Sequence, residues 1–157
     1  MRLLEKGIGV QQADWKVDQP QAAGYCRMYY MLGGRAVYTD DIQTTPLCTG
    51  RLYLFPAQRP YRIRHDPAAP IHCMWMHVDL YPSDVSRLVE LDPALPGNET
   101  LRGLLTSLES ESLANSGEEL YRCLAQALAL YLRRHPDIKN IDGMAAEVLS
   151  GIRGEPF

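Results

Sequence analysis

The first half of the chain consists of short hydrophobic runs that glycine and proline residues interrupt. Residues 61–65 alternate cleanly between apolar and polar, which is the period of a strand with one buried face. Residues 52–55 are apolar at every position and predict a strand that is buried on both faces. Short strands joined by tight turns are typical of a small antiparallel barrel. The predicted strands cover residues 8–10, 15–17, 25–32, 35–39, 42–45, 52–55, 61–65 and 71–80.

The last predicted strand, residues 71–80, has two chemically different faces, because successive side chains of a strand point to opposite sides. One face carries Cys73, Trp75, His77 and Asp79. The other face carries His72, Met74, Met76 and Val78.

After Pro82 the pattern changes to the period of a helix. Residues 83–91 predict a short helix. Asn98 is a suitable N-cap for a second helix. The apolar face of that second helix is predicted from the three-four spacing of Leu101, Leu104, Leu105 and Leu108.

The longest predicted helix spans residues 118–134. Ser116, with Glu119 three residues later, has the pattern of a capping box at its start. Pro136 stops the helix because proline cannot continue it. Residues 141–153 begin a further amphipathic helix whose apolar face meets nothing before the last residue, so we expect a domain boundary there.

The second half of the longest helix, residues 123–132, is apolar nearly all round. A helix with one packing partner needs only one apolar stripe, so this pattern predicts two partners. The barrel is one of them. The other is either a second copy of the same helix or another part of the same chain. The residues predicted at an interface between two copies are Leu120, Leu124, Ala127, Leu128 and Tyr131.

The composition is that of a soluble globular protein, with 46% hydrophobic and 22% charged residues among 157. This length suits one domain with a substantial core. The formal net charge is -3, whereas a chain of this size that binds nucleic acid by itself is expected to show a basic stripe. Arg59, Arg62 and Arg64 near one turn are too few for that role, and we expect them to form a solvated face.

The sequence shows neither a membrane span nor a signal peptide. A span needs about 18 consecutive apolar residues, and the residues after Met1 lack the apolar centre of a signal peptide. We therefore expect a cytoplasmic protein without membrane contact. The cysteines form no Cys-x-x-Cys pair and lie among apolar neighbours, which predicts buried free thiols. They are Cys26, Cys48, Cys73 and Cys123.

The barrel segment carries a modified form of a known signature. Gly50 and Pro56 have the spacing of the second cupin signature, with Gln58 in place of its second glycine and Tyr61 in place of its histidine. In this respect the chain resembles a cupin.

The first cupin signature, counted back from Gly34, is modified as well. Arg27 falls where the metal-binding glutamate of a cupin would stand, while Ala23 and Gln21 fall where the histidines would stand. A guanidinium repels a cation and cannot be its ligand at neutral pH. The resemblance therefore implies a barrel without a metal ion or other cofactor.

The runs at residues 29–34, 54–56 and 75–79, followed by helices, resemble the N-terminal sensing domain of AraC-family transcriptional regulators over residues 20–153. The resemblance implies a mostly β fold with C-terminal α, a cupin-like double-stranded β-helix (jelly-roll) barrel followed by two to three helices. It also implies a homodimer that binds a small-molecule effector. DNA would be bound only through a C-terminal helix-turn-helix domain that is not in this chain.

On this resemblance the chain divides into an N-terminal arm with the first strands, a barrel, a helical dimerisation segment, and a linker that starts a truncated DNA-binding domain. The corresponding residues are 1–24, 25–82, 83–135 and 136–157.

The cupin register implies which side chains face the barrel interior and contact an effector. They are Arg27, Tyr29, Tyr61, Ile63, Cys73, Trp75 and His77. Aromatic faces with hydroxyl donors suit a sugar, and Arg27 favours a carboxylate or phosphate. An inward arginine needs an acceptor or anionic partner, which is either the ligand or an internal carboxylate such as Asp18 or Asp79.

Three functions are compatible with the sequence. The one we favour is a sensor that binds a sugar or organic acid in a metal-free barrel. The second is a stand-alone cupin enzyme of the isomerase or epimerase type, for which only His77 and Tyr61 offer an acid–base pair. The third is a dimerisation module with an empty barrel. In the favoured function no residue is catalytic.

Overall fold

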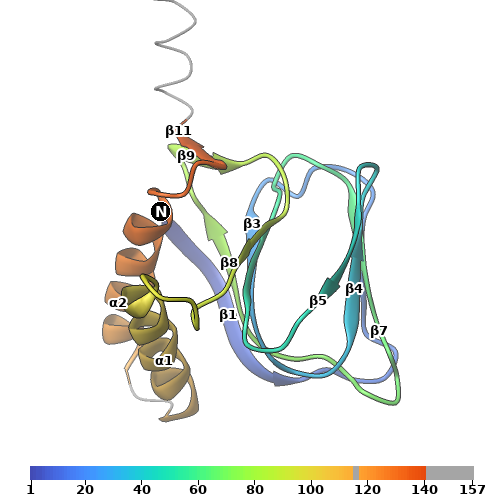
Figure 1. Cartoon of the computed structure of the whole chain (residues 1–157), viewed down its shortest axis with the longest axis horizontal. Coiled ribbons are helices and arrows are strands. Elements are labelled where there is room, and N and C mark those ends of the chain that lie inside the picture. The colour runs from blue at the N-terminus through green and yellow to red at the C-terminus, as the bar shows by residue number, and fades with distance from the viewer. Residues whose placement is uncertain (115–116, 141–157) are drawn as a thin grey trace, which may run out of the picture.

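The computed structural model describes residues 1–114 and 117–140. Two helices cover one face of a larger β-sheet, and a smaller sheet lies across its other face (Figure 1). The elements are β1 (Arg2–Val10), β2 (Lys16–Gln19), β3 (Cys26–Gly33), β4 (Ala36–Thr39), β5 (Thr44–Leu47), β6 (Leu52–Phe55), β7 (Tyr61–His65), β8 (His72–Asp79), β9 (Ser83–Val85), β10 (Val89–Leu91), α1 (Glu99–Ala114), α2 (Glu118–Leu132) and β11 (Ile138–Asn140).

The larger sheet has the strand order β1-β8-β3-β6-β10, and the smaller sheet has the order β2-β7-β4-β5. Neighbouring strands in both sheets are antiparallel. Strands far apart in the sequence lie side by side, such as β1 with β8 and β2 with β7. This arrangement is a cupin-like β-sandwich, so the predicted fold class is confirmed.

The strands of the larger sheet separate two hydrophobic cores. On β6, Leu52 and Leu54 pack with the helices, whereas Tyr53 and Phe55 lie between the two sheets. All of them are 0% exposed, which confirms a strand buried on both faces. We call the core between the sheets the inter-sheet core. The two faces predicted for β8 are confirmed in the same way, with Met74 toward the helices and Cys73 in the inter-sheet core.

The inter-sheet core is built around the ring of Phe55. Its centroid lies 4.9 Å from that of Tyr29, 5.5 Å from Tyr38, 6.4 Å from Tyr53 and 5.7 Å from Tyr61. Contacts of this kind add about 0.5–1.5 kcal/mol per pair to the burial of the rings. The aromatic side chains therefore hold the two sheets together.

The helix predicted over residues 83–91 is wrong. These residues form β9 and β10 instead, and β10 pairs with β6 at the edge of the larger sheet. Val85 and Val89 are buried at 0% and 2% exposure, respectively. Branched side chains suit a pleated, half-buried surface, and pairing with the open edge of β6 outweighs a weak local preference for a helix.

The other predicted helices are confirmed where the structure describes them. Leu101, Leu105 and Leu108 are fully buried on α1, as their spacing predicts. The N-cap of α2 is Gly117, which makes no side-chain hydrogen bond, and Ser116 lies outside the described residues. The helix predicted over residues 141–153 lies outside them as well. Neither of the two described helices is long and apolar enough to cross a membrane.

The prediction that every cysteine is buried is wrong for two of them. Cys26 and Cys73 are buried, but Cys48 and Cys123 are exposed, and all are free thiols. Cys48 follows β5 at a turn, and Cys123 lies on the outward side of α2. Apolar neighbours in the sequence do not bury a helical residue, because adjacent positions differ by about 100° around the axis.

Gly34 stands where the chain leaves β3 in the larger sheet for β4 in the smaller one. Its φ is +84°, and a Cβ at this position would overlap the carbonyl oxygen of Pro70. At the adjacent Gly33 a Cβ would lie 3.7 Å from the Cβ of His72, an ordinary contact. Of these two positions, only Gly34 therefore requires a glycine.

We predict that Gly34→Ala lowers the free energy of unfolding by about 2 kcal/mol or more, because it adds backbone strain and a collision with Pro70. Gly33→Ala is the matched control and should change it by less than about 1 kcal/mol. Urea unfolding of both variants measures the difference. Equal losses in the two variants would contradict the assignment.

Candidate functional site

One end of the space between the sheets is polar, and we call it the barrel mouth. It is formed where β3 and β7 begin and β2 and β8 end, with β1 alongside β8. Arg27 on β3 is the cross-strand neighbour of Phe55 on β6 and of His77 on β8. The side chains that meet there are Glu5, Gln19, Tyr25, Arg27, Tyr61 and His77.

Arg27 is half-buried and donates hydrogen bonds to neutral groups. Its Nη1 donates to the hydroxyl oxygen of Tyr61 at 2.6 Å and to Oε1 of Gln19 at 3.1 Å. Its Nη2 donates to the hydroxyl oxygen of Tyr25 at 3.0 Å. The guanidinium also lies 5.2 Å from the ring centroid of Tyr25, within the range of a cation–π contact.

Arg27 forms no ion pair with a carboxylate among the residues that the structure describes. The internal partners predicted for it, Asp18 and Asp79, are wrong. Asp18 accepts a hydrogen bond from Nη2 of Arg64 at 2.5 Å, and Asp79 lies 3.9 Å from Nη2 of Arg2. Each of the two carboxylates therefore pairs with an arginine other than Arg27.

Tyr61 is the nearest partner of Arg27 and remains neutral. Burial raises the pKa of its hydroxyl to about 12, even though the positive charge of Arg27 acts in the opposite direction. A neutral phenol oxygen accepts from the guanidinium and keeps its own proton as a donor. Tyr61 therefore satisfies part of the hydrogen-bonding capacity of Arg27 without neutralising its charge.

His77 lies beside Arg27 between two aromatic rings. Its ring centroid is 4.9 Å from that of Tyr25 and 5.0 Å from that of Trp75. Its Nδ1 is 3.3 Å from Oε2 of Glu5 on β1. Burial and the charge of Arg27 lower the pKa of His77, and these effects outweigh the opposite effect of Glu5.

Trp75 is positioned by a glycine on the neighbouring strand. Gly7 on β1 pairs with Trp75 on β8, and a Cβ on Gly7 would lie 2.5 Å from the indole ring. The absence of a side chain lets the indole lie over the backbone of β1. A glycine inside a strand is a sequence signal for such a close approach.

A family model described as an AraC-binding-like domain matches residues 3–133. The chain belongs to this family. It is a ligand-sensing regulatory domain of the AraC type, as the sequence resemblance implied.

Comparison with solved structures gives matches to ToxT from Vibrio cholerae. One is ToxT from strain O395 bound to (E)-4-(8-methylnaphthalen-1-yl)but-3-enoic acid, with 10% identity and a TM-score of 0.39 over 100% of this chain. A second ToxT structure has the same identity and TM-score. The AraC-binding-like domain spans about half of these proteins, covering 51% and 50% of their length. No curated protein matches.

The residues predicted to contact an effector divide into two groups in this AraC-binding-like domain. Tyr29, Tyr61, Ile63 and Cys73 belong to the inter-sheet core, and none is more than 5% exposed. Arg27, Trp75 and His77 are partly exposed at the barrel mouth. The sequence reasoning missed Glu5, Gly7 and Gln19, because β1 and β2 join the mouth only through pairing with distant strands.

The residues of the predicted acid–base pair, and those that the resemblance puts at cupin metal positions, make specific polar contacts. Tyr61 bonds to Arg27, whereas His77 contacts Glu5, so the two make their polar contacts with different partners. Arg27 and Tyr61, at the former cupin ligand positions, contact each other directly. The described part of the chain contains no group of three or more His, Cys, Asp or Glu residues that could hold a metal ion.

The residues predicted at a dimer interface are not equally accessible on α2. Leu120 is 52% exposed, while Leu124, Ala127 and Tyr131 are partly buried. Leu128 is 0% exposed within its own chain, which removes it from the predicted interface. The outward apolar side of α2 consists of Leu120, Cys123, Ala127 and Leu130, and we call it the α2 stripe.

We predict that His77 makes the domain less stable in mild acid. Its folded-state pKa is lower than the unfolded value of about 6.5, so the unfolded chain binds more protons in this range. The contribution of His77 is complete above that value and is lost as the pH falls through the folded pKa. Urea unfolding between about pH 7.5 and 5.5 should show a smaller loss for His77→Gln than for wild type. Parallel losses in the two proteins would contradict this.

Proposed function

We propose that this domain senses a small organic acid at the barrel mouth and dimerises through α2. In the complete protein it would control a helix-turn-helix DNA-binding domain outside this chain. The observation that carries the proposal is the half-buried guanidinium of Arg27, whose hydrogen-bond partners are all neutral.

A half-buried cation without a counterion is costly unless a partner compensates its charge. Arg27 has five N–H donors, and three hydrogen bonds to neutral oxygens leave part of this capacity unused. A carboxylate would accept two parallel charge-assisted hydrogen bonds from such a group. An acidic ligand therefore provides a negative charge that no described residue pairs with Arg27.

The barrel mouth also offers apolar surface for the body of such a ligand. Trp75 and Tyr25 present aromatic faces on either side of His77, and Trp75 is partly exposed. Pockets that combine apolar walls with a few fixed polar groups are typical of small-molecule sites. A ring or short chain with one acidic group matches this combination better than a neutral sugar, because Arg27 is the strongest polar group present.

β1 connects the mouth with the helices. Its Glu5 faces His77 in the mouth, while the Nζ of Lys6, on the opposite face of the strand, lies 4.3 Å from the ring centroid of Tyr121 on α2. A ligand acts on the rest of the protein only if it binds two arrangements with different affinity. We infer that displacement of Glu5 by an acidic ligand shifts β1 and alters its packing on α2.

We predict that organic acids raise the thermal midpoint of the domain and that neutral sugars do not. Arg27→Gln should weaken the binding of an active acid at least about tenfold, the equivalent of about 1.4 kcal/mol. Isothermal titration of wild type and variant measures this. Arg27→Lys keeps the charge but loses the planar group that donates two parallel hydrogen bonds. This variant should bind with intermediate affinity.

The matched control is Arg35→Gln, which removes an arginine that is 73% exposed and pairs with Asp66. It should bind the acid as wild type does. The proposal fails if Arg27→Gln retains full affinity, or if neutral sugars stabilise the domain while acids do not.

The α2 stripe supports the dimer. Leu120, Cys123, Ala127 and Leu130 follow one another at intervals of three, four and three residues, the spacing with which two helices pack along a common seam. Leu130 is 53% exposed in the single chain. Two copies related by a twofold axis would cover the same patch on each other, as cyclic dimers do.

We predict that Leu130→Glu converts a dimer to a monomer, because it places a charge in the seam. Leu113→Glu is the control, since Leu113 on α1 is 69% exposed and lies outside the α2 stripe. Sedimentation equilibrium of the three proteins gives their masses. A dimeric Leu130→Glu variant, or a monomeric wild type, would refute this interface.

A further inference from the structure

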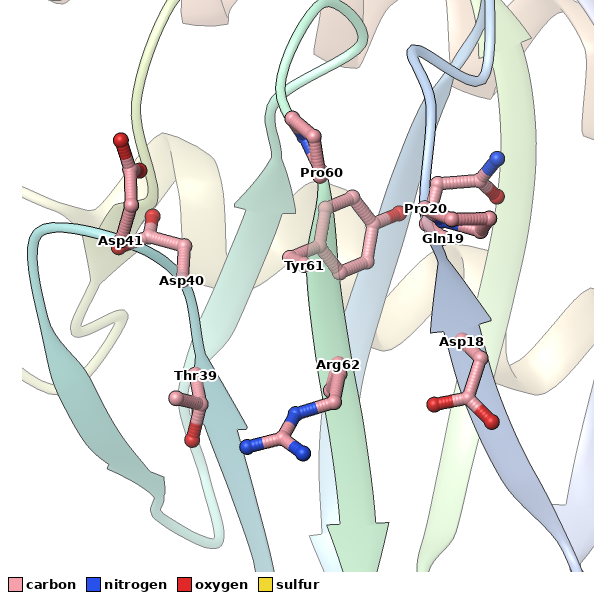
Figure 2. Close-up of a pocket in the computed structure, with 9 residues that line it drawn as sticks. All are labelled: Asp18, Gln19, Pro20, Thr39, Asp40, Asp41, Pro60, Tyr61 and Arg62. Carbon is pink, nitrogen blue, oxygen red and sulfur yellow. The ribbon is translucent and has the colours of Figure 1, made fainter.

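An open hollow of about 430 Å³ lies on the smaller sheet, beside the barrel mouth (Figure 2). It is formed by the end of β2, the start of β7, the end of β4 and the turn after β4. Pro20 and Pro60 contribute apolar surface at the ends of β2 and β7 that face the mouth. We call this cavity the Arg62 hollow, after the cation within it.

Arg62 points out of the sheet because its neighbours on β7, Tyr61 and Ile63, point into the inter-sheet core. Its cross-strand neighbours are Asp18 on β2 and Thr39 on β4. Figure 2 shows its side chain between these two, with the guanidinium turned toward Thr39. Within the described ranges, Arg62 makes no hydrogen bond and no ion pair.

The carboxylates that line the hollow have other partners. Asp18, the direct neighbour of Arg62, instead accepts a hydrogen bond from Arg64, which lowers the pKa of Asp18. Lys16 lies 3.6 Å from the same carboxylate. The charge of Asp18 is therefore compensated by the next pair of residues on the same face of β2 and β7.

The two acidic residues of the turn are compensated in the same way. The side chain of Asp40 is 0% exposed and accepts hydrogen bonds from the hydroxyl of Tyr38 and from two backbone N–H groups. Nη1 of Arg59 lies 3.8 Å from Asp40 and 3.7 Å from Asp41. Arg62 is thus the charge of the hollow that lacks a counterion among the described residues.

We propose that the Arg62 hollow is a binding site for a small molecule with an oxyanion group, either a carboxylate or a phosphate. The planar guanidinium can donate two parallel hydrogen bonds to either group, and the hydroxyl of Thr39 adds another donor beside it. The organic part of the ligand packs on Pro20 and Pro60. The volume lies within the range of small-molecule sites.

This site is distinct from the barrel mouth but shares a wall with it. Gln19 and Tyr61 line the Arg62 hollow and also accept hydrogen bonds from Arg27 at 3.1 and 2.6 Å. The two residues that accept hydrogen bonds from Arg27 therefore also border the hollow. By thermodynamic linkage, any effect of one site on the affinity of the other is reciprocal.

The test uses benzoate, phenyl phosphate and inorganic phosphate as probes, with benzyl alcohol as the neutral counterpart. Backbone amide spectra of the whole chain are recorded during each titration. We expect shifts at Thr39, Asp41 and Arg62 with benzoate or phenyl phosphate, and none of comparable size with benzyl alcohol. The tighter of the two aromatic probes identifies the preferred oxyanion, and inorganic phosphate alone should bind more weakly because it lacks the apolar part.

Arg62→Gln should weaken the titration at Thr39 and Asp41 at least about fivefold, since a charge-assisted hydrogen bond is lost. Arg62 is exposed, so this variant is expected to fold. Arg35→Gln on the same sheet should titrate as wild type. Unchanged affinity in Arg62→Gln, or equal binding of benzyl alcohol, overturns the proposal. Shifts confined to Arg27 and His77 also overturn it, while leaving the barrel-mouth site intact. Arg27→Gln gives the reverse comparison, because it should weaken binding at the barrel mouth and retain binding in the Arg62 hollow.

Discussion

The packing of Phe55 against Tyr29, Tyr38, Tyr53 and Tyr61 determines much of the rest of this domain. These rings are almost completely buried between the sheets. A buried hydroxyl without a partner is costly, and three of these tyrosines reach polar groups at the edges of the core. Tyr53 donates to Glu90 at 2.7 Å, Tyr38 donates to Asp40 at 2.6 Å, and Tyr61 accepts from Arg27 at 2.6 Å. The aromatic core thereby places the charged residues around its rim.

This core also explains where a ligand can act. Tyr29, Ile63 and Cys73 are almost completely buried, so their role in the structure is packing. Polar and partly exposed groups gather instead at the barrel mouth around Arg27 and in the hollow around Arg62. In both places an arginine lacks an acidic partner among the described residues, while the nearby carboxylates contact other side chains. These two arginines are the basis of the acidic ligands that we propose, even though the whole chain carries a net charge of -3.

The sequence was most informative where burial follows directly from local pattern. The run at residues 52–55, the alternation on β8 and the leucines of α1 all behave as their periodicity predicts. The prediction failed at residues 83–91, where a helical pattern gave way to pairing with the open edge of β6. It also failed for Cys123, because burial on a helix depends on which side faces the sheet. These failures share one cause: a distant segment provides the competing or the covering surface.

By itself, the sequence determined the strands from β3 to β8, the helices α1 and α2, and the two faces of the central strands. These properties depend on short-range periodicity and on spacing along the chain. Only the tertiary structure decided which charges meet. Glu5 reaches His77, and Gln19 reaches Arg27, because β1 and β2 pair with strands far along the chain. Asp18 accepts a hydrogen bond from Arg64, two residues along β7 from its direct cross-strand neighbour Arg62. Arg62 therefore lacks this carboxylate as a partner. Side-chain geometry across neighbouring strands selects one partner from two similar ones, and no local pattern encodes that choice.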